Sequence, residues 1–439
     1  MSTLPLWACG IIGAGVFFTL MFLKMHVGLS MMIGGFVGFI LTRGLPAAES
    51  TLAGTIYEVA TSPILVVIPL FVLMGVIAGA GGVIAAAFET FDKWLGHLRG
   101  GLAMATVGAC AAFGAVCGDN IATAVTMNKA ALPSMRKMGY DDKLSFGSIA
   151  AGGNLGILIP PSAAFVVYGF ITENNIANLF VSGILPGIIL TAMFMFTIAI
   201  WCRRDPSLSS KHEPQTWKVR LTSLKGMIGI VVVFLLVMGG LMGGVFTPQE
   251  AGAVGTVAMI VVSLFYRKLT WKSLGHALIE STRTSAMILL LIMGARYFSY
   301  FITTTELPQT LSDLILNGNL NGYVVIILVC ILWIILGMLM DIWSAMIITL
   351  PIFYGILLQL GFDPLQLGVI VVLCIMLGCI TPPVGVVVFS LSGMHPDVPM
   401  YTIFKGVWPF IYCMFIFLLM IIFIPWLSTF LPSLVVPSY

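Results

Sequence analysis

The sequence predicts an all-α polytopic membrane protein, arranged as an inverted-topology repeat with two re-entrant helical hairpins and two broken transmembrane helices. Of its 439 residues, 59% are hydrophobic and 8% are charged, and the mean hydropathy is +1.10. A soluble domain carries about 25% charged residues. Two further observations predict the arrangement in the membrane: the distribution of lysine and arginine, and a Pro-Pro pair that recurs in two apolar spans.

Ten apolar stretches are predicted to cross the membrane, because about 20 apolar residues span a bilayer. Two pairs of stretches, 103–117 with 121–135 and 323–340 with 342–360, are too short or too interrupted to cross. Each pair is predicted to form a hairpin that enters and leaves on one side. The predicted crossings are 5–23, 25–42, 64–82, 144–171, 180–200, 226–245, 247–265, 285–303, 365–393 and 403–424.

The basic residues test this layout, because cytoplasmic loops carry an excess of lysine and arginine. With the chain starting outside, seventeen basic residues fall in predicted cytoplasmic segments, and only Arg43 falls on the outer side. The remaining two, Lys129 and Arg296, fall inside the membrane. If either hairpin were a full crossing, everything after it would flip and the bias would collapse. Both termini are therefore predicted on the outer side.

The chain divides into two similar halves at the polar stretch 201–225, which is predicted to be a cytoplasmic linker. Under the predicted topology each matched pair of features runs in opposite directions, as in many secondary transporters. A shift of 222 residues aligns Gly156 with Gly378, Pro160-Pro161 with Pro382-Pro383, and Asp119 with Asp341. The predicted parts are a first repeat over 1–200 (hairpin about 103–135, broken helix 144–171), a second over 226–425 (hairpin about 323–360, broken helix 365–393) and an outer tail over 426–439.

The two Pro-Pro breaks predict ion and anion sites. Carbonyls at the end of one half-helix can coordinate sodium, and N–H groups at the start of the next can hold an anion. Each hairpin tip is expected to meet the break of its own half, which gives two pseudo-symmetric sites. Asp119 and Asp341 lie at the tips, where they either compensate a cation or cap the second helix of the hairpin, and both interpretations stay open.

Other polar side chains distinguish the two breaks. Asn120 and Asn154 offer amides near the first, and Thr381 offers a hydroxyl just before the second, where the aligned residue is Ile159. A polar residue at such a break favours a functional interpretation. Ser162 and Val384 follow the two breaks and are candidates to face a substrate.

Lys129 and Arg296 carry charges at membrane depth, which are costly and indicate function by default. Arginine suits bidentate recognition of a carboxylate or sulfonate-like group. The alternatives are an ion pair within the protein or snorkelling to the outer surface for Arg296. For Lys129 they are a pair with Asp119 or contact with cytoplasmic water.

Three polar or aromatic segments are predicted to lie at the membrane surface. The basic amphipathic stretch 267–283 is expected to be an interfacial helix on the cytoplasmic face, separate from the crossing 285–303, and 91–101 is expected to be similar. The aromatic tail "FIPWLSTFLPSLVVPSY" is expected to be an anchor at the outer interface.

Four motifs carry a resemblance to a known family. They are "RKMGYDDKLSFGSIAAGGNLGILIPPSAAFVVYG", "NLFVSGILPGI", "GVFTPQEAGAVG" and "LGCITPPVG", beginning at Arg136, Asn178, Gly244 and Leu377. Together they resemble the large membrane subunit of tripartite ATP-independent periplasmic (TRAP) transporters, and the resemblance covers nearly the whole chain.

This resemblance implies a sodium-driven importer of small organic anions, carboxylates or sulfonates, which works by an elevator movement. It implies a multi-pass protein of the bacterial inner membrane with periplasmic termini, whose partners are a small four-helix membrane subunit, a periplasmic substrate-binding protein and the surrounding phospholipid. The sodium sites carried over are the surroundings of Gly118, Asp119, Asn120, Asn154 and Gly156, and of Gly337, Asp341, Gly378, Thr381 and Pro382. Candidate substrate-binding residues are Asn120, Lys129, Ser162, Arg296, Thr381 and Val384.

The sequence departs from the family pattern around the expected cavity. The first tip is "CGDNIATA" rather than Ser-rich, Asn154 stands where threonine is common, and Lys129 and Arg296 are additional. The extra positive charge favours a compact, strongly acidic anion. The alternative function is a stand-alone ion-coupled anion exchanger or channel with the same repeat. An intramembrane enzyme is not expected, since no histidine is predicted at membrane depth. No organic cofactor is expected, and no nucleic-acid partner, because the basic residues are topological signals.

Overall fold

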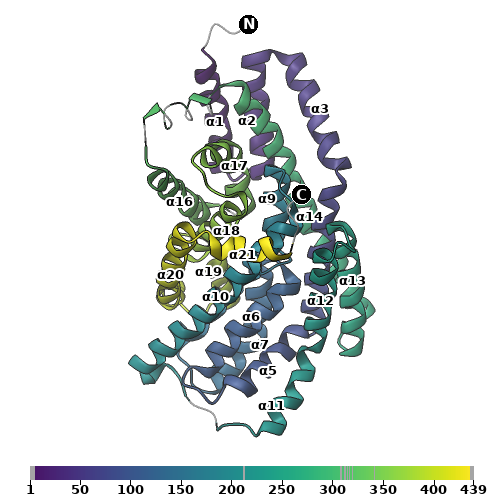
Figure 1. Cartoon of the computed structure of the whole chain (residues 1–439), viewed down its shortest axis with the longest axis vertical. Coiled ribbons are helices and arrows are strands. Elements are labelled where there is room, and N and C mark those ends of the chain that lie inside the picture. The colour runs from purple at the N-terminus through teal and green to yellow at the C-terminus, as the bar shows by residue number, and fades with distance from the viewer. Residues whose placement is uncertain are drawn as a thin grey trace.

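In the computed structural model the described residues are 5–210, 213–306, 309–310, 313, 315, 317–318, 320–340 and 342–435, and every regular element among them is helical (Figure 1). Asp341 lies outside these residues, so its predicted roles stay predictions. The first half contains α1 (Leu6–Phe22), α2 (Val27–Arg43), α3 (Leu45–Thr61), η1 (Pro63–Val66), α4 (Val67–Ala80), α5 (Val83–Leu95), α6 (Gly101–Cys117), α7 (Asn120–Lys137), α8 (Asp142–Leu158), α9 (Ala163–Thr172) and α10 (Ile176–Arg204).

The second half follows a short connecting segment that contains η2 (Pro206–Leu208). Its described helices are α11 (Trp217–Ser223), η3 (Leu224–Met227), α12 (Ile228–Met242), α13 (Pro248–Phe265), α14 (Trp271–Thr304), α16 (Gly322–Leu339), α17 (Ile342–Gln359), α18 (Pro364–Ile380), α19 (Val386–Met394), α20 (Met400–Phe423) and α21 (Trp426–Val435).

Seven of the described helical stretches are long and apolar enough to cross a membrane. The pair α8 and α9 reaches this length only together, across a bend of 41°. The seven stretches are Pro63–Ala80, Ile176–Arg204, Trp217–Met242, Pro248–Phe265, Trp271–Thr304, Gly322–Leu339 and Met400–Phe423.

Both predicted hairpins and both broken helices are present, but α16, which was predicted to be too short or too interrupted to cross, is long and apolar enough to do so. α6 and α7 are joined by Gly118 and Asp119, and α16 and α17 are separated by two residues. α8 ends just before Pro160-Pro161, and α18 ends just before Pro382-Pro383; both Pro-Pro bonds are cis. Proline has no N–H to donate and clashes with the preceding turn, so each helix must stop there.

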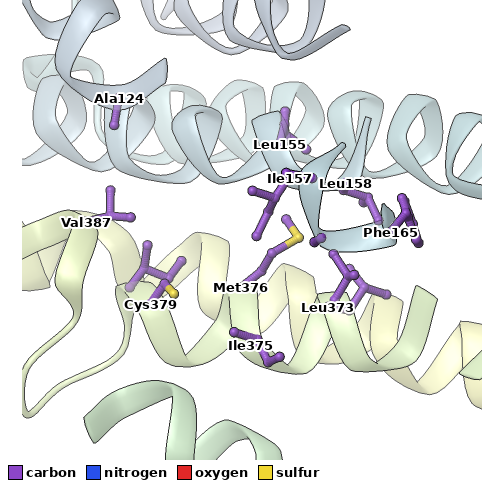
Figure 2. Close-up of a cluster of buried hydrophobic side chains, with 14 of the residues drawn as sticks. Ala124, Leu155, Ile157, Leu158, Phe165, Leu373, Ile375, Met376, Cys379 and Val387 are labelled. Carbon is purple, nitrogen blue, oxygen red and sulfur yellow. The ribbon is translucent and has the colours of Figure 1, made fainter. Parts of the chain in front are cut away.

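The two repeats meet through their broken helices. Every residue from Leu144 to Leu158 in α8 and from Gln366 to Ile380 in α18 is buried. Figure 2 shows side chains of α8 and α9, such as Ile157 and Phe165, beside Met376 and Leu373 of α18. The second arm of each hairpin also packs against the other repeat: α7 against α19, and α17 against α9. We call α6–α9 and α16–α19 the central unit.

A second set of helices packs mainly within itself. α14 lies against α2, α3 and α4, and α13 lies against α4 and α12. We call α1–α4 and α12–α14 the outer group. Figure 1 shows α3, α12, α13 and α14 along one side of the molecule. α5, α10 and α20 pack against the central unit, chiefly on α6 and α8.

One expectation from the sequence is wrong in detail. The stretch 267–283 does not form a separate interfacial helix, because α14 runs unbroken from Trp271 to Thr304. Thr270 caps its start, accepting from the Ser273 N–H while the Ser273 hydroxyl accepts from the Thr270 N–H. No proline follows until after the helix has ended. The polar first turns therefore continue directly into the apolar part.

The hydropathy pattern did not predict that α3 and α21 are helices. α3 (Leu45–Thr61) lies between two predicted crossings and was missed, although Pro46 stands in its first turn, where proline favours a helix. The aromatic tail forms α21, which packs on α10 and α18. Its predicted role as an interface anchor stays a prediction.

Candidate functional site

A cavity of ≈ 310 Å³ lies where the predicted machinery converges. The first hairpin tip contributes 117–122, and the second hairpin contributes Trp343. The two broken helices contribute Ala163, Cys379 and Val386, all within a few residues of the Pro-Pro bonds. Helices α4 and α14 of the outer group close the remaining side. The cavity therefore lies between the central unit and the outer group.

The first hairpin tip meets the break of its own half, as predicted. Gly118 has a φ of +66°, and a Cβ there would lie 2.7 Å from the carbonyl oxygen of Pro161. A Cβ on Gly156 would lie 2.6 Å from the carbonyl oxygen of Asp119, and one on Gly114 would lie 2.8 Å from the Cα of Gly156. Only glycine permits this approach of backbone to backbone.

The second half repeats this contact. A Cβ on Gly337 would lie 3.3 Å from the Cα of Gly378, and a Cβ on Gly378 would overlap the backbone of Gly337. Gly114 with Gly156 and Gly337 with Gly378 therefore place each hairpin's first arm against the broken helix of its own repeat. The aligned glycines share a physical role, because neither site has room for a side chain.

Asn154 links the first tip to the other repeat. Its side-chain oxygen accepts a hydrogen bond from the Asn120 amide at 3.1 Å, and its own amide donates to the Met376 carbonyl of α18 at 2.8 Å. Both asparagines are buried. The predicted amides near the first break are thus brought together, and they connect the two broken helices across the centre of the molecule.

Each break also uses a hydroxyl to satisfy a carbonyl. Ser162 Oγ donates to the Ile157 carbonyl at 2.5 Å, and it accepts from the Ala164 N–H at the start of α9 at 3.2 Å. Thr381 Oγ1 donates to the Leu377 carbonyl at 2.6 Å. The asymmetry predicted from Ile159 and Thr381 is therefore one of position: one hydroxyl follows its Pro-Pro pair and the other precedes its own.

Asp119 caps the second arm of the first hairpin. Its Oδ1 accepts from the Ala122 N–H at 2.6 Å, and its backbone carbonyl accepts from the Thr123 hydroxyl at 2.5 Å. The capping interpretation is confirmed. Asp119 is half-buried and also lines the cavity. Compensation of a cation by the same carboxylate stays a prediction.

Lys129 and Arg296 do not line this cavity. Lys129 is exposed, and no ion pair of it with a described residue is found. Arg296 lies 3.6 Å from Glu58 of α3 and 3.9 Å from Glu173, and its guanidinium lies over the ring of Phe170 at 5.1 Å. The internal ion pair considered as an alternative is thus present. Substrate contact by either cation stays a prediction.

The remaining predicted residues lie beside the two Pro-Pro breaks. Thr381 is buried, Pro382 is half-buried and Val384 is exposed, and none of the three lines the cavity. Ser162 is buried directly before Ala163, which does line it. More of the residues predicted at the first hairpin tip than of those predicted at the second therefore line the cavity.

Sequence reasoning missed the face that α14 presents to the cavity. Glu280, Thr284, Met287 and Ile288 follow one another at helical spacing and all line it. The signal was present, because these positions share one face if the helix continues. The polar stretch 267–283 instead predicted a separate helix at the membrane surface, and such a helix would not bring this face to the cavity.

A comparison with family models matches residues 14–427 of the chain. The family is described as "Tripartite ATP-independent periplasmic transporter, DctM component". The match includes both hairpins and both broken helices.

Curated relatives extend over most of the chain. The C4-dicarboxylate TRAP transporter large permease protein DctM of Pseudomonas aeruginosa is 32% identical, over 88% of this chain and 90% of the relative. The isethionate TRAP transporter permease protein DctMQ of Oleidesulfovibrio alaskensis is 31% identical, over 91% of this chain and 63% of the relative. The sialic acid TRAP transporter permease protein SiaT of Haemophilus influenzae is 30% identical, over 96% and 68%.

Among solved structures, the fold resembles that of the YdaH transporter of Alcanivorax borkumensis, described as having an unusual topology. The TM-score is 0.56 at 13% sequence identity, and the match covers 90% of this chain and 89% of that one. This likeness concerns the fold alone.

Proposed function

The chain belongs to the DctM component family of tripartite ATP-independent periplasmic transporters, and from this premise we propose that it imports a small organic anion with sodium as the coupling ion. The observation that carries the proposal is the cavity of ≈ 310 Å³ between the first tip, the second hairpin and the two breaks. The named substrates of its relatives, C4-dicarboxylate, isethionate and sialic acid, are all organic acids. A carboxylate or a sulfonate is therefore the proposed cargo.

Oxygen donors at the first tip support sodium as the coupling ion. Hard cations take oxygen ligands. The Asp119 carboxylate and carbonyl, the Thr123 hydroxyl and the Asn120 amide lie within one turn of α7, against Gly156 of the broken helix. The surroundings of Gly118, Asp119, Asn120, Asn154 and Gly156 are proposed to hold one ion. The surroundings of Gly337, Gly378, Thr381 and Pro382 are proposed to hold another.

We place the protein in the bacterial inner membrane with two protein partners, a small four-helix membrane subunit and a periplasmic binding protein. The chain covers 63% of the isethionate relative, so that protein contains a further segment. Exposed apolar side chains on the outer group, such as Val231, Leu235 and Phe265, suit contact with lipid or with another membrane helix. The distribution of basic residues supports a periplasmic position for both termini.

Movement of the central unit past the outer group is the proposed transport step. The cavity lies on the boundary between the two, so a shift of the central unit would carry the bound anion across. Arg296 of α14 contacts Glu173, which directly follows α9, and this contact also crosses the boundary. An ion pair at 3.9 Å with an exposed carboxylate is weak enough to break during such a movement.

The test is uptake by the reconstituted complex, with its small subunit and its binding protein, under separately imposed gradients. A sodium gradient alone is expected to drive accumulation of the acid that the binding protein carries. A proton gradient of equal size in sodium-free buffer is expected to drive none. Uptake driven only by protons would remove sodium from the proposal.

A further inference from the structure

The charge of the cavity restricts its substrate. Among the described residues that line it there is no lysine, arginine or histidine, whereas two carboxylates, Asp119 and Glu280, are present. Glu280 comes from α14 in the outer group and is exposed, with no ion pair found to any described residue. The carboxylates therefore face the cavity from both sides of the boundary between the central unit and the outer group.

The rest of the lining is mainly apolar. Besides backbone, the cavity presents aromatic and aliphatic side chains, including Phe71, Met287, Ile288 and Trp343. Apolar ligand surface gains free energy when it leaves water for such a lining, in proportion to its area. A substrate with an apolar body therefore suits these walls better than one that is polar throughout.

From charge and lining together, and resting on the proposed function, we infer that the substrate is a monoanion with a mainly apolar body, such as a branched 2-oxo monocarboxylate. One negative charge can be balanced by the coupling ions. A second would face two carboxylates with no cationic side chain among the described lining residues to offset them, and like charges at close range repel. Lys129 and Arg296 do not line this cavity, so their charge does not enter the balance of charges within it.

The inference is tested by equilibrium binding to the large and small subunits together in nanodiscs, without the binding protein, so that only the membrane cavity selects. The probes are radiolabelled 4-methyl-2-oxopentanoate, pyruvate and succinate at pH 7.5 in 100 mM sodium chloride. The branched monoanion is expected to bind at least about tenfold more tightly than succinate and about fivefold more tightly than pyruvate. Equal or tighter succinate binding would overturn the inference.

Two variants separate the effects of charge and apolar contact. Glu280→Gln is expected to strengthen succinate binding by a factor at least about threefold larger than the factor by which it strengthens binding of either monoanion. Its control is Glu89→Gln, another exposed acid, which does not line the cavity.

Met287→Ser is expected to weaken binding of the branched acid more than that of pyruvate. Its control is Leu278→Ser, which is exposed on the same helix away from the cavity.

Failure of the inference differs from failure of the proposed function. Sodium-driven uptake of a dianion, with tight succinate binding to the membrane subunits, would keep the function and reject the monoanion. If none of the three acids binds, the inferred substrate class is rejected as well, and the sodium-gradient experiment then decides the function by itself. Because the comparison of the three acids uses the native protein, it holds even if a variant fails to fold.

Discussion

Gly118 and Gly139 have nearly the same backbone conformation in very different surroundings. Their φ angles are +66° and +72°, a region that costs a side chain about 1–2 kcal/mol. No atom of the described residues lies within 4 Å of a Cβ added to Gly139, whereas one on Gly118 would lie 2.7 Å from the Pro161 carbonyl oxygen. A substitution at Gly139 therefore introduces backbone strain alone, whereas one at Gly118 introduces the same strain and a clash between the hairpin tip and the break.

Gly118→Ala is expected to lower the melting temperature of the purified complex further than Gly139→Ala, and to abolish most sodium-driven uptake. The reason is that alanine at the tip adds a clash with Pro161 to the strain that both variants share. Thermal unfolding and uptake at equal protein amount provide the measurements. Equal effects of the two substitutions would show that contact between tip and break is unimportant.

Asn154 is the residue on which the link between the repeats depends. Asn154→Ala leaves the Met376 carbonyl and the Asn120 amide without their buried partner, which costs about 1–3 kcal/mol for an unsatisfied group. We expect a lower melting temperature and a higher sodium concentration for half-maximal uptake. The control is Ser148→Ala, since the buried Ser148 hydroxyl donates only to Ser145 in its own helix. A normal sodium dependence in the Asn154 variant would exclude this link from ion binding.

At the level of single residues, the sequence predicted which residues meet at the first hairpin tip but not the α14 residues across the cavity from them. Asp119, Asn120 and Asn154 were predictable because polar residues at a break in an apolar helix have few other roles. Glu280 was not, since its place depends on how α14 packs against the hairpin tip. Tertiary packing of this kind leaves no local pattern.

At the level of elements, hydropathy and proline positions predicted the hairpins and broken helices to within a few residues. They do not predict α14 as one helix, because the change from polar to apolar residues indicates a boundary that the structure does not have. A helix ends where caps and breakers end it, and none lies between Trp271 and Thr304. Composition also missed α3, whose Glu58 pairs with Arg296. Its 17 residues are too polar to be recognised as a crossing.

The ends of three elements are joined by one arginine outside the apolar spans. Arg136, in the last turn of α7, pairs with Asp142 at the start of α8 at 3.1 Å and with Asp397 before α20 at 2.9 Å. The guanidinium lowers the pKa of the Asp397 carboxyl below its ordinary value of 3.8. Because that pKa is lowered on folding, the pair stabilises the folded state above pH 3.8 and loses this effect as the pH falls through the lowered value.

Asp397→Asn is therefore expected to lower the melting temperature slightly, and by the same amount at every pH from 6 to 8. The ordinary pKa of the Asp397 carboxyl, 3.8, and its lowered pKa in the folded state both lie far below pH 6, so the charge of Asp397 does not change within this range. Thermal unfolding across the range, with Glu213→Gln as an exposed control, measures the effect. A difference that grows or shrinks with pH would assign the stabilisation to another group, His395 at 3.8 Å being the nearest candidate.

At the level of the whole molecule, the inverted repeat places two similar units, each a hairpin packed against a broken helix, around one cavity. The 222-residue shift predicted this pairing, and the charge bias predicted its orientation, because both follow from rules that act over the whole chain. How the central unit contacts the outer group was not predictable. That boundary is formed by side chains from α4, α9 and α14, which are far apart in the sequence.

Movement at this boundary is the central claim, and a distance measurement across it is the most direct test. Tyr57 on α3 is exposed, as is Glu173 after α9, and the two flank the Arg296 contact. Cysteines at 57 and 173 can carry spin labels, because all eight native cysteines are buried. A second pair, 57 and 245, lies within the outer group and serves as the control.

Electron–electron double resonance on the reconstituted complex would then report the distance between the two labels with and without sodium and the transported acid. If the central unit moves past the outer group, the pair 57 and 173 should show two populations of distances whose proportions shift when ion and acid are added. The pair 57 and 245 should show one unchanged distance. A single distance for 57 and 173 that stays constant under conditions where the complex transports would contradict this movement.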